Sequence, residues 1–250
     1  MKYYSLFIAL FLCSLSSSYV VAAPVGGTAE SRALNEQGIA ALRAGKTEKA
    51  EALLKKSYAA DRFNLTAAYN LAGAYLANKK DAPAVLLLEE LTTRVQDDPD
   101  IWFRLGDAKF SSQDPKGARQ AYEKGLSLDP KRKGIHKKIA TTYTLTNQLP
   151  EAEKSLFKAV EESPKDAQAL LNLGSVLVAN NKASEAVRIV KKSLQHDVSA
   201  DAYITLGSAY EQLKDPKSAL IAFEKAKALG TETKELTTKI KELYTVVENG

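Results

Sequence analysis

The residues of this sequence best suited to metal binding or nucleophilic catalysis are two histidines and one cysteine, His136, His196 and Cys13. A metal site needs several such side chains, or carboxylates, at ligand spacing, and neither histidine has a second ligand at that spacing. We therefore interpret both histidines as structural or surface residues. Cys13 lies in an apolar run at the start of the chain, so the residues after that run have no disulfide framework, no thiolate metal site and no thiol nucleophile.

The sequence also lacks the short motifs that accompany nucleotide chemistry and ester hydrolysis. It contains no G-x-x-x-x-G-K-[ST], no G-x-G-x-x-G and no G-x-S-x-G. The acidic pairs Glu89-Glu90 and Glu161-Glu162 lie in amphipathic segments and are typical of solvated helix faces. We expect no catalytic residues, no metal site and no cofactor, and we predict that the chain is not an enzyme.

An N-terminal segment, residues 1–23, differs from the rest of the chain. Lys2 and the apolar run from Leu6 to Leu15 precede the small residues Ala22 and Ala23, which is typical of a secretory signal peptide. Cleavage after Ala22 is favoured over cleavage after Ala23, because the latter would leave a proline directly after the cut. The predicted location is therefore periplasmic or secreted.

Two alternatives remain for this segment. It is about as long as the shortest membrane-spanning helices, so it would also serve as an uncleaved anchor. Lipid modification of Cys13 is the other alternative, although Leu12 stands where such sites have a small residue. No other long apolar run follows, so we predict no membrane span in the mature chain.

The rest of the chain has a globular composition, with 45% apolar and 26% charged residues, and its net charge of +5 is too small to indicate nucleic-acid binding. From residue 31 one pattern recurs every 34 residues or so. Its clearest copy has the signature residues Trp102, Leu105, Gly106, Ala118, Tyr122 and Pro130. These spacings suit two short antiparallel helices, in which Gly106 and Ala118 are small where the two backbones come close.

This pattern resembles the tetratricopeptide repeat, a helix-turn-helix unit with the consensus W-x-x-L-G-x-x-Y, A-x-x-x-F and P. Lys109 departs from it, because it stands where the family has tyrosine. We predict six units, all with alanine at the central position of the second helix, the fifth being one residue short. The units are 31–64, 65–98, 99–132, 133–166, 167–199 and 200–233.

The segments on either side of the repeats have their own patterns. Residues 24–30 contain two glycines and no apolar periodicity, which predicts a flexible lead. In 234–250, Leu236, Ile240 and Leu243 share one helical face, which predicts an amphipathic helix that caps the apolar end of the array. The predicted fold is thus all-α, a right-handed α-solenoid of six TPR helix-turn-helix units with a C-terminal capping helix.

The turns between the predicted helices contain recognisable end signals. Asp114 and Asp215 each precede a proline, which predicts a capping carboxylate followed by proline at the first helical position. Thr47 and Ser184 are predicted to cap in the same way. Gly45 and Asn147 suit the left-handed residue that ends a helix.

The resemblance implies where a partner would bind, because in this family the first helix of every pair lines a concave groove. The predicted partner-binding residues are Asn35, Tyr69, Asn70, Phe103, Arg104, Asp107, Phe110, Lys137, Thr141, Asn172, Ser175 and Ser208. The same mapping places Lys138, Asp201, Thr205 and Glu211 on this face.

Two sets of these residues have alternative interpretations. Asn70 and Asn172 would hold a bound peptide backbone, since an amide both donates and accepts hydrogen bonds, or they would bond only to neighbouring helices and water. Tyr69, Phe103 and Phe110 would form an apolar pocket, although at least one of them is expected to pack between helices instead.

A basic cluster, defined by Lys131, Arg132, Lys133, Lys137 and Lys138, lies at the junction of the third and fourth units. It would either meet an acidic or phosphate-bearing partner or be a solvated patch, which the sequence favours. We predict a protein–protein interaction scaffold that binds another protein or peptide segment during assembly of an envelope or secretion complex. The alternative is an accessory factor that contacts glycan for envelope polysaccharide or peptidoglycan enzymes. The oligomeric state stays open.

Overall fold

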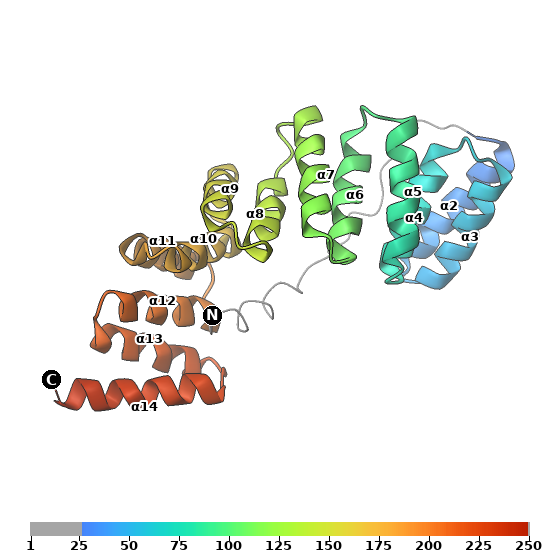
Figure 1. Ribbon diagram of the computed structural model, residues 1–250. Helices are drawn as coiled ribbons and strands as arrows, with labels where there is room; N and C mark the ends of the chain where they lie inside the picture. Colours follow the sequence, from blue (N-terminus) through green and yellow to red (C-terminus); the bar gives the residue numbers. More distant parts are fainter. Residues whose placement is uncertain (1–26, 250) are drawn as a thin grey trace. The chain divides into compact units, whose positions relative to one another are not determined.

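The computed structural model describes residues 27–249, which form thirteen α-helices and no strands (Figure 1). The predicted signal peptide lies outside these residues. The chain divides into two compact units, one ending at Gln96 and the other beginning at Asp97. The first unit contains α2 (Ala29–Arg43), α3 (Thr47–Ala60), α4 (Leu65–Ala77) and α5 (Asp81–Arg94). The second contains α6 (Pro99–Ser111), α7 (Pro115–Leu128), α8 (Ile135–Leu145), α9 (Leu149–Glu162), α10 (Ala167–Ala179), α11 (Ala183–His196), α12 (Ala200–Gln212), α13 (Pro216–Ala228) and α14 (Lys234–Asn249).

Packing within each unit follows the order of the chain. Every helix packs against the next, and the first helices of neighbouring pairs also touch in α2/α4 and α10/α12. This nearest-neighbour arrangement is that of a solenoid, so the predicted all-α array of helix pairs is confirmed. One detail of the lead differs: Ala29 and Glu30 are helical, because Thr28 caps α2 by accepting a hydrogen bond from the Ser31 N–H at 3.2 Å.

The two helices of a pair interlock through a small residue on one and a large residue on the other. A Cβ placed on Gly106 of α6 would lie 2.4 Å from the ring of Tyr122 on α7. In the sixth repeat a Cβ on Gly207 would lie 2.6 Å from the ring of Phe223. The glycines therefore stand where the signature requires close approach, and a side chain there is excluded by overlap.

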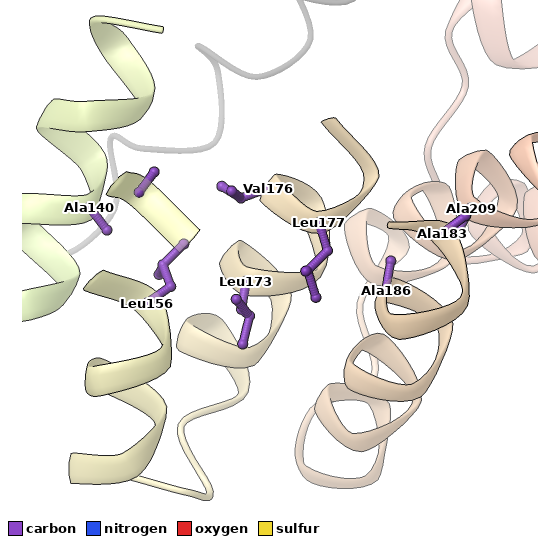
Figure 2. Close-up of a cluster of buried hydrophobic side chains, with 9 residues drawn as sticks. Ala140, Leu156, Leu173, Val176, Leu177, Ala183, Ala186 and Ala209 are labelled. Carbon is purple, nitrogen blue, oxygen red and sulfur yellow. The ribbon is translucent and has the colours of Figure 1, made fainter. Parts of the chain in front are cut away.

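The alanines of the second helices have a similar function. Figure 2 shows a core cluster in the second unit, which includes Ala186 and larger side chains such as Leu156 and Leu177. Ala186 and Ala152 of this cluster are both fully buried. Alanine at this place lets the neighbouring helix approach, and the leucines then fill the space on either side. The repeated alanine of the sequence is thus explained by packing between helices.

The helix ends agree only in part with the predicted signals. Asp114 and Asp215 accept hydrogen bonds from the N–H groups of Gly117 and Ser218 at 2.8 and 3.0 Å, so both predicted caps are confirmed. The predicted caps at Thr47 and Ser184 are wrong. Each of those helices begins earlier than the sequence suggests, after a lysine that makes no side-chain cap, so both hydroxyls lie inside the first turn.

The turn inside each pair requires one residue in the left-handed region. Gly45 and Asn147 have φ values of 70° and 57°, as predicted. The same place in the other repeats is occupied by Lys79, Gln113, Asn181 and Lys214, all with positive φ. Hydrogen bonds of the turn impose this conformation. The N–H group of the residue after the left-handed one donates back across the turn, as Lys80 N–H does to the Tyr75 carbonyl at 2.8 Å.

Neighbouring repeats in the first unit are joined by a polar clasp centred on Glu51. Its carboxylate accepts from Asn78 Nδ2 at 2.6 Å, from Lys80 Nζ at 2.9 Å and from Lys55 Nζ at 2.6 Å. Burial by itself raises the pKa of Glu51, but the hydrogen bonds from Lys55, Lys80 and Asn78 outweigh it and lower the pKa to about 2. A like clasp recurs in the second unit, where Glu153 accepts from Asn180 and Lys182 at 2.7 and 2.6 Å.

The clasp predicts a specific loss of stability in acid. The pKa of Glu51 in the folded chain lies below its ordinary value of 4.5, so its stabilisation is fully present above pH 4.5 and is lost as the pH falls toward about 2. We expect Glu51→Gln to lower the urea midpoint at pH 6 and to flatten its decline between pH 5 and pH 3. Equal declines in the wild type and the variant would contradict this role for Glu51.

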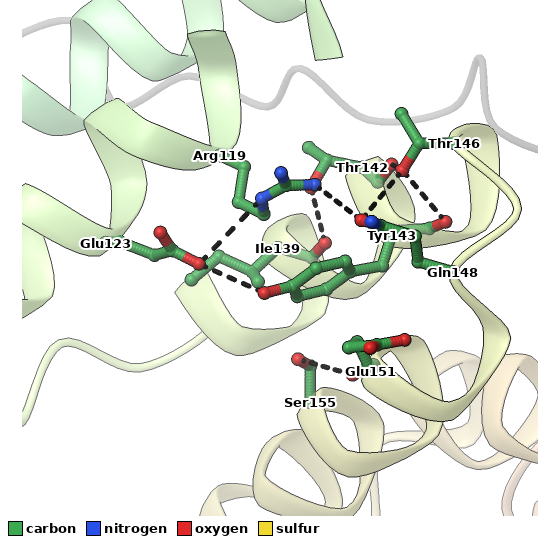
Figure 3. A network of polar contacts seen from close by, with 9 residues as sticks. All are labelled: Arg119, Glu123, Ile139, Thr142, Tyr143, Thr146, Gln148, Glu151 and Ser155. Atoms are coloured by element: carbon green, nitrogen blue, oxygen red, sulfur yellow. Dashed lines mark hydrogen bonds and ion pairs between the residues drawn. The ribbon is translucent and has the colours of Figure 1, made fainter. Parts of the chain in front are cut away.

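At the corresponding place between the third and fourth repeats the charge is reversed (Figure 3). Arg119 lies over the ring of Tyr143 at 4.6 Å and donates to Gln148 Oε1 at 3.0 Å. Tyr143 in turn donates to Glu123 at 3.2 Å. Residues at the same repeat positions thus join neighbouring repeats at these junctions, but the types of side chain differ from one junction to the next.

The last helix, α14, packs on α13 as the first helix of a further repeat would. Lys239 lies over the Phe223 ring at 5.4 Å, as Lys138 of α8 lies over the Tyr122 ring at 5.6 Å. The other face of α14 differs from that of a repeat's first helix. It has the exposed Lys241 at the position where the first helices of the repeats have glycine or alanine. A second helix cannot approach closely over a lysine, so α14 ends the stack, and the predicted capping helix is confirmed.

Candidate functional site

The predicted partner-binding residues lie on the first helices of the pairs: α2 and α4 in one unit, and α6, α8, α10 and α12 in the other. In the first unit, Asn35 of α2 and Asn70 of α4 are both buried, and Asn70 Nδ2 donates to Asn35 Oδ1 at 3.0 Å. Asn70 is fully buried, so its amide joins two helices and is closed to a peptide. Tyr69 beside it is half-buried.

In the third repeat, Phe103 is a core residue. Only 6% of it is exposed, and its ring fills the space beside Gly125, where a Cβ would lie 2.4 Å away. The guanidinium of Arg132 covers the same ring at 5.0 Å. Arg104 is also buried, at 8% exposed. Of the three aromatics, Phe103 is therefore the one that is fully part of the core.

Two other residues of α6 remain at the surface. Phe110 is half-buried and packs against the cluster that contains Tyr122 and Ile139. Asp107 accepts hydrogen bonds from Tyr122 Oη at 2.7 Å and from Lys138 Nζ at 2.5 Å. Burial, together with the Asp107 carboxylate, raises the pKa of Tyr122 far above its ordinary value, so its hydroxyl stays a donor.

The basic cluster is largely neutralised by carboxylates of neighbouring helices. Arg132 pairs with Asp100 at 2.7 Å and Asp129 at 2.9 Å, and Lys137 pairs with Asp166 at 2.7 Å. Lys138 pairs with Asp107, as above. Three of its five cations thus join elements within the second unit, and Lys131 and Lys133 are the exposed remainder.

The polar residues of α8, α10 and α12 form the rest of the candidate surface. Thr141 is buried and donates to the Lys137 carbonyl at 3.1 Å. Asn172 is half-buried and accepts from Gln168 on its own helix at 2.8 Å. Ser175 lies 3.3 Å from Thr205 of α12, and Ser208 is half-buried. Unlike Asn70, Asn172 therefore keeps a side chain at the surface.

Sequence reasoning missed the ion pairs that occupy several of these residues. His136, interpreted as structural, has Nδ1 at 2.5 Å from Glu162 Oε1, and Glu162 also accepts from the Gly134 N–H. Lysines and carboxylates close to one repeat apart were the available signal. Such residues lie on adjacent first helices, as Asp107 and Lys138 do, or on a first helix and directly before the next one, as Lys137 and Asp166 do, so a pair at that spacing is placed to form a bond.

The arrangement offers hydrogen-bond donors, acceptors and charges along helix faces. Within residues 27–249 no group of three His, Cys, Asp or Glu side chains is arranged to hold a metal ion. In the same range no helix is both long and apolar enough to cross a bilayer.

Four family models, each described as a tetratricopeptide repeat, match residues 41–105, 99–132, 146–197 and 200–229. Among known proteins, Tetratricopeptide repeat protein 21B of Mus musculus is 23% identical over 76% of this chain, and the match spans 15% of its own length. The Homo sapiens protein O-mannosyl-transferase TMTC3 is 29% identical over 50% of this chain and 14% of its own. The chain therefore matches only a small part of either relative.

Solved structures have the same fold. PilW, described as a widely conserved type IV pilus biogenesis factor, has a TM-score of 0.70 at 16% identity and covers 85% of this chain and 99% of its own. PilF of Pseudomonas aeruginosa has a TM-score of 0.68 at 15% identity, covering 86% and 97%. YrrB, described as a TPR protein with an unusual peptide-binding site, has a TM-score of 0.67 at 19% identity, covering 76% and 97%. These identities establish the fold alone. The helix pairs, their interlocked glycines and the matching repeat models together show that this chain belongs to the tetratricopeptide repeat family.

Proposed function

We propose that the chain is a non-enzymatic scaffold that holds a segment of another protein against the first helices of its repeats. The observation that carries this proposal is the run of half-buried polar side chains on α10 and α12, namely Asn172, Ser175 and Ser208. These residues lie at the surface of a stack of packed helices, where an extended segment finds donors and acceptors without displacing core side chains.

Crosslinking tests this surface directly. A photoreactive residue belongs at Asn172 and not at Phe103, because Phe103 is buried and a bulky replacement there would disturb the core. We expect a probe at 172 to capture a discrete partner in living cells, and a probe at exposed Lys158 on α9 to capture much less. Equal capture at both sites, or none at 172, would contradict binding on the first helices.

We further propose that residues 1–23 are a secretory signal peptide and that the mature chain works in the assembly of an envelope or secretion complex. The signal-like sequence and the structural similarity to the pilus biogenesis factor PilW support this proposal. N-terminal sequencing of the protein from cell envelopes is expected to begin at Ala23 or Pro24. A chain that keeps Met1 and remains with the cytosolic fraction would contradict it.

The glycan-binding alternative depends on exposed aromatic side chains that stack on sugars. Phe103 is buried, so it offers no stacking face to a glycan. Tyr69 and Phe110 are half-buried, so the alternative rests on these two rings, whereas the protein-segment proposal is supported by the run of polar side chains on α10 and α12 and is the better supported of the two.

A further inference from the structure

The third and sixth repeats are unusually alike. Residues that match at corresponding positions include Asp100 and Asp201, Leu105 and Leu206, Gly106 and Gly207, and the Asp-Pro-Lys sequences at 114–116 and 215–217. Their contacts match as well: Tyr143 donates to Glu123 beside the third repeat, and Tyr244 donates to Glu224 beside the sixth. A difference between the two repeats at one place can therefore be interpreted residue by residue.

In the third repeat, Asp100 is near the start of α6 and holds an arginine of its own chain. The guanidinium of Arg132 lies 2.7 Å from Asp100 and 2.9 Å from Asp129, over the ring of Phe103. Arg132 is the last residue of its repeat, directly before the next unit. In other repeats the last residue also bonds to the first helix of its own repeat. Asn64 Nδ2 donates to Ser31 Oγ at 2.8 Å, and Asp166 Oδ2 accepts from Lys137 Nζ at 2.7 Å.

In the sixth repeat the carboxylate is present and the arginine is not. Asp201 is near the start of α12, while Gly230 and Thr233 stand where the third repeat has Asp129 and Arg132. Within residues 27–249 the Asp201 carboxylate forms no hydrogen bond or ion pair, although it is half-buried. Burial raises the pKa of Asp201. Its charged form has no guanidinium beside it, whereas Asp100 has that of Arg132.

Nearby charges on this face favour a cation. Glu235 and Glu242 of α14 occupy the same places in their helix as Asp201 and Ser208 do in α12, and both are exposed. Of the three lysines of α14, Lys234 and Lys241 are exposed, and Lys239, which lies between Glu235 and Glu242, is already paired with Glu211 at 2.5 Å. Among the residues that the structure describes, the carboxylates of Asp201, Glu235 and Glu242 therefore have no ion-pair partner.

We propose that Asp201 is the anchor for an arginine side chain of the partner segment, which takes the place that Arg132 occupies in the third repeat. This proposal rests on the proposed scaffold function and specifies the chemistry of its partner. Arginine is favoured over lysine, because its planar guanidinium donates two parallel hydrogen bonds to a carboxylate. The partner's arginine supplies the compensating charge that the chain itself supplies to Asp100.

A first experiment tests the site without any partner. Thr233 caps α14 by accepting from the Leu236 N–H at 3.1 Å, so Thr233→Ala is the matched control for loss of the cap. We expect Thr233→Arg to melt roughly 2–4 °C above Thr233→Ala, because the new guanidinium pairs with Asp201. This difference should vanish when Asp201→Asn is added to both variants. A difference that persists with Asp201→Asn, or no difference at all, would show that Asp201 does not receive a guanidinium from this place.

A second experiment tests binding with a phage-displayed pool of random twelve-residue peptides. Arginine should be enriched in the peptides selected by the wild-type chain, and not in those selected by Asp201→Asn or by Thr233→Arg, whose site is already filled. Replacing that arginine with neutral citrulline in a selected peptide should weaken binding roughly tenfold or more, as expected for a charged hydrogen bond. Glu161→Gln on α9 removes the same charge from an exposed helix face and should leave selection unchanged.

The two proposals fail in different ways. Crosslinking at Asn172 that is unaffected by Asp201→Asn, with no arginine enrichment, would overturn the arginine anchor and leave the scaffold intact. Absence of crosslinking at Asn172 would overturn the scaffold, whatever the melting temperatures of the Thr233 variants.

Discussion

Replacing Tyr122 with alanine is expected to lower the free energy of unfolding of the second unit by about 3–5 kcal/mol, the usual cost of deleting a large buried aromatic side chain. Tyr122 is 2% exposed and its ring fills the space that Gly106 leaves open. Its hydroxyl also donates to Asp107 at 2.7 Å. Urea unfolding followed by the fluorescence of Trp102, the only tryptophan, measures the loss in this unit.

Two further variants separate the contributions of the ring and the hydroxyl. Tyr122→Phe keeps the ring and should cost about 1.5 kcal/mol, the value of a hydrogen bond to a charged group. Tyr244→Ala is the matched control, because Tyr244 also donates to a carboxylate, that of Glu224, but is 43% exposed. We expect it to cost less than about 1 kcal/mol. Similar losses of unfolding free energy for Tyr122→Ala and Tyr244→Ala would show that the Tyr122 ring does not stabilise the third repeat.

Adding a single methyl group at Gly174 is expected to destabilise the second unit by about 1–3 kcal/mol, through overpacking. A Cβ at this place would lie 2.3 Å from Val190 Cγ2, where α10 and α11 meet. Valine in a helix has essentially one χ1 rotamer, so Val190 cannot turn its methyl group away. The helices must therefore separate, although alanine is by itself the better helix former. Urea midpoints of Gly174→Ala and the wild type measure the cost.

The sign of this effect should reverse when the opposing methyl group is removed. In a Val190→Ala background the nearest remaining side-chain atom is the Cβ, at an ordinary contact distance of 3.6 Å. Adding Gly174→Ala to that background should then be neutral or stabilising by up to about 1 kcal/mol, the helix propensity of alanine over glycine. A cost that is the same in both backgrounds would show that the overlap with Val190 is not its cause.

The sequence predicted the architecture well because its signals are local. Gly106, Ala118 and Tyr122 recur at spacings that only a pair of close helices satisfies, and Asp114 and Asp215 mark helix starts through bonds within one turn. The same kind of signal failed at Thr47 and Ser184, because their helices begin after a lysine that makes no side-chain cap. The left-handed lysines at 79 and 214 were missed for a related reason, since the turn imposes that conformation on whatever residue is present.

The candidate site was less predictable, because position on a helix does not determine exposure. Asn70 and Asn172 hold the same place in their repeats, yet Asn70 is fully buried against Asn35 and Asn172 remains half-buried. The residue on the neighbouring helix determines this difference. Asn70 of the second repeat faces an asparagine, Asn35, and Asn172 of the fifth repeat does not. Pairing of Lys137 and Lys138 with carboxylates of adjacent helices is likewise invisible in either helix alone.

By itself, the sequence determined the number of helix pairs, the small and large residues that interlock them, and the helix that ends the stack. These features depend on contacts between residues a few turns apart, which spacing along the chain specifies directly. Only the tertiary structure decided which groove residues are closed by packing, which charges are already paired, and that within residues 27–249 Asp201 has no cation where Asp100 has one. Those properties depend on side chains from neighbouring repeats meeting in space, and the repeat pattern leaves their identities unconstrained.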